Sequence, residues 1–134
     1  MNLKWNTNML NSFYSVIKID ESFKKIFEQF GLPLNRTIEQ GFESLAKIII
    51  GQQISTNVAK SLSDKLKKDG MLNEKKISEA SIEKLKLYGL SSQKSSYLKN
   101  LATLTIKNEI DINSFNKLKS DEVTNLLIKI KGIG

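Results

Sequence analysis

The sequence contains neither cysteine nor histidine, and it has one proline and one tryptophan among 134 residues. These 134 residues therefore offer no thiol nucleophile, no imidazole base, no disulfide and no Cys/His zinc site. Proline breaks helices and glycine favours turns, so a single proline and singly placed glycines leave long segments open to helix formation. The absence of cysteine also suits a cytosolic protein.

Long apolar runs are missing as well. The most apolar stretch, Leu45–Ile50, is far shorter than the ~20 residues that a membrane helix needs. The first ten residues, MNLKWNTNML, lack the continuous apolar segment of a signal peptide. We therefore expect no membrane segment and predict a cytoplasmic location, nucleoid-associated in a prokaryote or nuclear in a eukaryote.

Basic residues outnumber acidic ones, by 21 to 14. Most of this excess falls after residue 50, and an uneven basic charge favours a polyanionic partner such as nucleic acid. The alternative is compositional, because lysine, isoleucine and asparagine are together abundant in proteins from AT-rich genomes. Charge alone leaves both interpretations open.

Apolar residues recur at spacings of three and four, which predicts helices that bury one face. No convincing alternating run indicates a sheet, so the predicted fold class is all-α. The first expected helix spans 20–30 and is capped by Asp20, and the second is opened by the capping box TIEQ (Thr37–Gln40). A third helix is capped by Ser55 and closed by Gly70, and the last one is capped by Ser120 and reaches Ile130. Two further helices are expected between these, over 81–87 and 91–106.

Three stretches carry a more specific signal. They are FESLAKIIIGQQIS (Phe42–Ser55), GLSSQKSSYLKNLA (Gly89–Ala102) and LIKIKGIG (Leu127–Gly134). In this order they resemble the helix-hairpin-helix (HhH-GPD) DNA glycosylases, in particular the 3-methyladenine DNA glycosylase II branch. The resemblance implies one all-α domain over 1–134, with N-terminal helices in 1–41 and central helices in 42–134 that end in the first half of the hairpin.

The resemblance assigns DNA contacts to two places. Gln53 holds the position of the side chain that fills the gap left by a flipped nucleotide, while Gln52 and Ser55 flank it. The backbone N–H groups at the hairpin are expected to hold a phosphate, with a lysine beside it. The residues expected to bind DNA are Gln52, Gln53, Ser55, Lys94, Lys131, Gly132, Ile133 and Gly134.

Each assignment has a structural alternative. Gln52 and Gln53 could simply bond to the backbone at a helix end, and Gly132 could be an ordinary helix C-cap. Lys94 could face DNA or solvent. Tyr97 is expected to pack in the core.

The family's catalytic aspartate follows the hairpin, so the resemblance implies that no catalytic residue lies within 1–134. The candidate carboxylates inside the chain are better explained by helix-start charges and solvated surface. We therefore expect the chemistry to lie downstream of Gly134, and these residues to be the first part of a longer enzyme, inactive alone.

The leading prediction is a DNA N-glycosylase of base-excision repair. It would remove alkylated purines such as 3-methyladenine by base flipping and hydrolysis, without a metal or other cofactor, and act as a monomer on double-stranded DNA that carries a damaged base. One alternative is a non-catalytic helix-hairpin-helix DNA-binding module. Another is a helical protein-interaction domain with lysine-rich surfaces.

Overall fold

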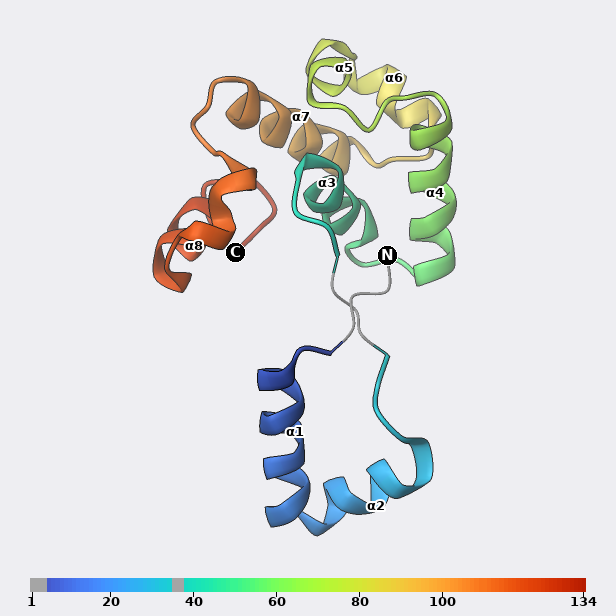
Figure 1. Ribbon diagram of the computed structural model, residues 1–134. Coiled ribbons are helices and arrows are strands. Elements are labelled where there is room, and N and C mark those ends of the chain that lie inside the picture. The colour runs from blue at the N-terminus through green and yellow to red at the C-terminus, as the bar shows by residue number, and fades with distance from the viewer. Residues whose placement is uncertain (1–4, 35–37) are drawn as a thin grey trace. The chain divides into compact units, whose positions relative to one another are not determined.

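The computed structural model describes residues 5–34 and 38–134 (Figure 1). The described residues form helices and no strands, so the predicted all-α class is confirmed. The chain divides into two compact units, 1–38 and 39–134, and the single domain expected from the sequence stays a prediction. The helices are α1 (Thr7–Ile19), α2 (Glu21–Phe30), α3 (Phe42–Gly51), α4 (Thr56–Lys68), α5 (Glu74–Glu79), α6 (Ile82–Leu87), α7 (Ser92–Ile106), the 3-10 helix η1 (Ile112–Lys117) and α8 (Ser120–Leu127).

The core of the second unit forms around α3. This helix lies between α4 and α7 and packs against both, and α7 also contacts α5 and α6 (Figure 1). Ile49 and Ile50 of α3 are fully buried, as are Leu98 and Leu101 of α7. The core stripe predicted for the segment 91–106 is therefore confirmed, and it fixes α7 against the end of α3.

Most helices begin where a short polar side chain satisfies free backbone N–H groups. Asp20 accepts from the backbone of Ser22 and Phe23, and Ser55 accepts from that of Val58, as predicted. The same arrangement recurs at the starts of α1, α5, α6 and α7, where the caps are Asn6, Asn73, Ser81 and Ser91.

The predicted start of α3 is wrong. Residues 38–41 are not helical, and the helix begins at Phe42, while Thr37 lies outside the described residues. The Gln40 amide, which the capping box would turn back on its own segment, instead donates to the carbonyl of Ile112. A tertiary contact thus takes the side chain that a local pattern assigned to a cap.

The end of the chain also differs from the prediction. Ser120 is the first residue of α8, not its cap, and the N–H of Lys119 is bound by the Glu122 carboxylate at 2.8 Å. The helix ends at Leu127, so Ile130 follows it, although Ile130 is only 1% exposed.

Three elements are absent from the helices predicted by range: α1, which buries no residue, and two short elements, α5 and η1. α5 has only six residues and a single buried one, Ile77, so it offers no periodic stripe. The 3-10 helix η1 is equally short, and Ile112 is its buried residue.

The first unit is a helix pair. Its aromatic rings pack edge to face, with Phe13 and Phe27 at a centroid distance of 5.6 Å and Trp5 next to Phe13. None of the residues of α1 or α2 is buried. Within 5–34 and 38–134, no helix has the length and apolar character to cross a membrane.

Candidate nucleic-acid interface

The loop between α3 and α4 places two adjacent glutamines in different environments. Gln52 is half-buried, and its Nε2 donates to the carbonyl oxygen of Gly132 at 2.7 Å. Gln53 is exposed and adopts a left-handed backbone conformation, with φ of 57°. Such a conformation is uncommon for a residue with a side chain.

A lysine from α7 caps the end of α3. The Nζ of Lys94 donates to the carbonyl of Ile50 at 2.7 Å. A cation at a helix C-terminus complements the negative end of the dipole and one of its unpaired carbonyls. Partial burial lowers the pKa of the Lys94 ammonium from its ordinary value, because desolvation disfavours the charged form. In this structure Lys94 holds the loop in place, and its predicted DNA contact stays a prediction.

The turn after α8 is tied to the core at several points. Buried Ile130 anchors it, and the N–H of Lys131 donates to Asn100 Oδ1 at 2.8 Å. The N–H of Ile133 donates to the carbonyl of Ile130 at 3.0 Å. Of the N–H groups expected to hold a phosphate, that of Ile133 is thus already paired within the turn. Those of Gly132 and Gly134 donate to no acceptor among the described residues.

Gly132 is packed directly on an aromatic ring. Its φ is 88°, and a Cβ built on it would lie 2.3 Å from Tyr97 Cδ2, far inside van der Waals contact. Only glycine fits here, for its backbone conformation and for space alike. Tyr97 is half-buried and its hydroxyl accepts from Gln93 Nε2 at 2.6 Å. The core role predicted for Tyr97 therefore includes supporting the turn.

Three segments enclose a groove with a volume of ≈ 720 Å³. They are the loop 52–55 between α3 and α4 (the glutamine loop), the start of α7, and the turn 128–134 after α8. None of the side chains that line it is acidic, and Lys94 supplies a cation. The groove therefore favours an anionic or hydrogen-bonding ligand over a cation. Its lining residues are Gln52, Gln53, Ile54, Ser91, Gln93, Lys94, Tyr97, Gly132 and Gly134.

The sequence and the structure overlap on this groove. Five of the eight residues predicted to bind DNA line it; Ser55, Lys131 and Ile133 do not. Ser55 caps α4, and the Ile133 side chain packs against the core. Sequence reasoning missed Gln93 and Asn100 because nothing local marks them: Asn100 reaches a backbone group 31 residues away.

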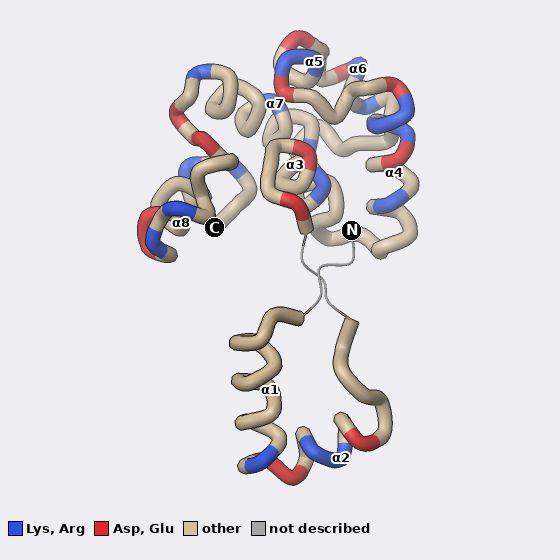
Figure 2. The backbone as a smooth tube through the Cα atoms, in the orientation of Figure 1, with Lys and Arg blue, Asp and Glu red and all other residues tan. Residues whose placement is uncertain are grey.

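Charge elsewhere in the second unit is mixed. Lysines lie beside acidic residues along α4, α5 and α6, and in α4 the lysines outnumber a single aspartate (Figure 2). Such faces add salt-dependent attraction to a polyanion without defining a site.

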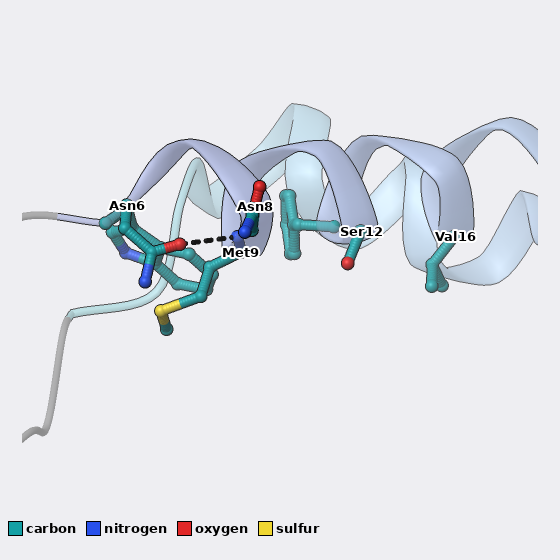
Figure 3. A pocket seen from close by; sticks show the side chains of 7 residues that line it. Asn6, Asn8, Met9, Ser12 and Val16 are labelled. Atoms are coloured by element: carbon teal, nitrogen blue, oxygen red, sulfur yellow. Dashed lines mark hydrogen bonds between the residues drawn. The ribbon is translucent and has the colours of Figure 1, made fainter. Parts of the chain in front are cut away.

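A second hollow, on α1, has a different character. Its volume is ≈ 480 Å³, and residues from Trp5 to Val16, none of them charged, line it. Asn6, Asn8, Met9, Ser12 and Val16 lie along one side of the helix, and Asn6 is occupied as its cap, accepting from the Met9 N–H at 2.8 Å (Figure 3). Because no lysine or arginine lines this hollow, it offers no positive charge to bind a DNA phosphate.

Comparison with known families gives one match. The family model described as HhH-GPD superfamily base excision DNA repair protein matches residues 46–128, which include the glutamine loop, α7 and all of α8. A comparison with curated protein sequences gave no significant match.

Several solved structures are similar to the chain. The 3-methyladenine DNA glycosylase of Schizosaccharomyces pombe, in complex with abasic DNA, has a TM-score of 0.83 at 24% identity over 92% of this chain. The DNA-3-methyladenine glycosidase of Bacillus halodurans has a TM-score of 0.72 at 25% identity over 89%. The 3-methyladenine DNA glycosylase of Archaeoglobus fulgidus has a TM-score of 0.73 at 25% identity over 92%. The matched part covers 64%, 56% and 46% of these chains, respectively.

Proposed function

The chain belongs to the HhH-GPD superfamily of base excision DNA repair proteins, and on this basis we propose that the protein is a DNA glycosylase. Its substrate is double-stranded DNA with an alkylated purine of the 3-methyladenine type. It acts where the chromosome lies, in the nucleoid or the nucleus. One observation carries the proposal: an exposed, left-handed Gln53 shares an acid-free groove with the turn at Gly132.

The two sides of the groove have separate tasks. The N–H groups of Gly132 and Gly134 hold a phosphate and fix the position of the DNA without reading its sequence. Gln53 enters the base stack of the duplex when the damaged nucleotide is flipped out. Its amide can stack on the neighbouring bases and form a hydrogen bond with the unpaired base of the opposite strand. Flipping costs a few kcal/mol, and a side chain in the gap opposes the return of the base.

The reaction itself is a hydrolysis. Water adds to the sugar carbon as the bond to the base breaks, and the base departs with the bonding electrons. Positive charge develops on the sugar, so a carboxylate nearby would stabilise the transition state and position the water. The groove of the described residues contains no such group, and we propose, as the resemblance implies, that the catalytic aspartate lies outside residues 1–134.

Similarity to known glycosylases supports the proposed substrate. The S. pombe relative is an enzyme bound to abasic DNA, the product of base removal. A protein whose reaction produces an abasic site is expected to bind abasic DNA more tightly than an intact duplex, because flipping a nucleotide out of the helix costs less free energy where the base is missing.

The experiment is a binding comparison of Gln53→Ala with the unchanged chain. Fluorescence anisotropy measures affinity for a duplex carrying a tetrahydrofuran abasic analogue and for the intact duplex of the same sequence, at fixed salt. Because a base contact by stacking contributes roughly 1–3 kcal/mol, we expect about a ten-fold loss for abasic DNA and little change for intact DNA. Gln29→Ala, at an exposed site of α2, is the control. An equal loss on both duplexes would refute the role of Gln53.

The acid-free groove is also what a non-catalytic helix-hairpin-helix DNA-binding module would show. That alternative predicts salt-sensitive duplex binding with no preference for abasic DNA. Release of methylated bases from alkylated DNA by residues 1–134 would instead contradict the proposed placement of the chemistry.

A further inference from the structure

Gln52 links two segments that lie 80 residues apart in the sequence. Its amide at the end of α3 reaches the Gly132 carbonyl of the turn after α8. One end of this link adjoins Gln53, and the other lies inside the turn. A single side chain therefore joins the two parts of the groove to which the proposed function assigns DNA contacts.

The bond fixes one peptide plane from both sides. The carbonyl of Gly132 and the N–H of Ile133 belong to the same planar unit and point in opposite directions. Gln52 binds the carbonyl at 2.7 Å, and the Ile130 carbonyl accepts from the N–H at 3.0 Å. With this central plane held, the flanking N–H groups of Gly132 and Gly134 are restricted in direction as well.

The other end of the link needs support for a different reason. Gln53 holds a left-handed conformation that costs about 1–2 kcal/mol for a residue with a side chain. Such a conformation persists when its surroundings determine it. Lys94 fixes the chain before the loop through the Ile50 carbonyl, Ser55 fixes it afterwards as the cap of α4, and Gln52 fixes its centre.

We propose that Gln52 is a positioning residue that holds Gln53 in register with the phosphate-binding turn, so that both engage the same stretch of DNA. The inference rests on the proposed function. Gln52 donates its amide hydrogen to protein and acts on DNA through Gln53 and the turn. Two adjacent glutamines thus have different tasks, one within the protein and one toward the ligand.

The test replaces the amide while keeping the length of the side chain. Gln52→Met removes the donor, and Gln52→Asn leaves the amide one methylene short of the carbonyl as a second variant. Each is made alone and with Gln53→Ala. Affinities for the duplex with a tetrahydrofuran site and for the intact duplex are measured by anisotropy at one salt concentration. Thermal melting records the effect on stability.

Gln40→Met is a matched control. Gln40 also donates its amide to a distant backbone carbonyl, that of Ile112, but it does not line the groove. Both substitutions remove the same kind of bond. A purely structural role would give the two variants the same profile: a lower melting temperature and an unchanged preference for abasic DNA.

We expect Gln52→Met to lower the affinity for abasic DNA about three- to ten-fold, the equivalent of one hydrogen bond, and to reduce the preference over intact duplex. In the Gln53→Ala background the same change should have a much smaller effect, because residues that act as a unit are not additive. Gln40→Met should leave the preference unchanged.

Three results would overturn the inference. If the unchanged chain shows no preference for abasic DNA, the proposed function fails and the inference with it. If that preference exists and both Gln52 variants retain it in full, only the inference fails. Fully additive losses in the double variant would mean that Gln52 contacts DNA independently of Gln53.

Discussion

The two compact units are stabilised in different ways. In 39–134, apolar side chains from α3 to the turn after α8 form a continuous buried cluster. In the described part of 1–38, the aromatic rings contact one another while large apolar side chains stay open to solvent: Phe30 is 72% exposed and Leu34 is 87% exposed. No residue of α1 or α2 is buried, whereas the groove requires a core that holds distant segments in register.

The largest expected effect concerns the core itself. Ile49→Ala removes a fully buried side chain of α3, and we expect the free energy of unfolding to fall by about 2–5 kcal/mol, from lost transfer energy and the cavity left behind. Ile26→Ala makes the same change in α2 at a side chain that is 55% exposed, and should cost well under half as much. Denaturant titration followed by circular dichroism measures both. Equal losses would contradict the difference between the units.

The second effect compares two glycines with positive φ. Gly31→Ala meets nothing within 4 Å, so it should cost only the backbone strain, about 1–3 kcal/mol for a conformation that is almost reserved for glycine. Gly132→Ala is strained as well, at a φ of 88°, and adds a Cβ clash with the Tyr97 ring, so it should destabilise more and displace the turn. We expect a marked loss of affinity for both abasic and intact duplex in Gly132→Ala alone. Melting temperatures and anisotropy test this, and full DNA affinity in that variant would remove the turn from the interface.

The smallest effect concerns two surface ion pairs of the second unit that share one carboxylate. Lys47 and Lys67 contact the Glu43 carboxylate at 2.6 and 2.8 Å and lower its pKa from the ordinary 4.5. A depressed carboxyl pKa stabilises the fold above the unfolded value, and this contribution disappears as pH falls through the folded value. Since all three side chains are more than a third exposed, Glu43→Gln should lower Tm by only about 1–3 °C at pH 7.

Two comparisons check the Glu43 prediction. The difference between Glu43→Gln and the unchanged chain should disappear in acid, as the pH falls through the lowered pKa of Glu43, and it should shrink in high salt because screening weakens exposed pairs. Glu28→Gln in α2 has no ion-pair partner among the described residues, and should leave Tm nearly unchanged at either pH. A difference that persists in acid would assign the effect to packing.

Much of the helical framework follows from the sequence. Asp20 and Ser55 cap the helices expected of them, and the segment from Ser91 to Ile106 is a helix that buries Leu98 and Leu101. These features depend on residues within one or two turns of each other. For the same reason, the three motifs could be identified from the order and spacing of their residues alone.

The predictions that fail involve groups that take another partner than the expected one, whether that partner is distant or nearby. α3 starts later than predicted, and the Gln40 amide of the predicted capping box bonds instead to a residue 72 positions away. The N–H of Ile133 is paired within the turn, while Asn100, which no local pattern marks, holds the N–H of Lys131. A sequence pattern shows that a group can form a hydrogen bond, but it does not show which partner takes it.

The sequence by itself determined the helical class, the absence of thiol and imidazole chemistry from these residues, and the order of the motifs that mark the superfamily. Both of the adjacent glutamines line the groove, and only the tertiary structure decided that Gln52 is bonded within the protein while Gln53 stays exposed. Helix caps and periodicity are local properties, set by neighbours along the chain. The Gln52 bond to Gly132 exists because packing of α3 against α7, and of the turn against Tyr97, brings residues 80 positions apart within 2.7 Å.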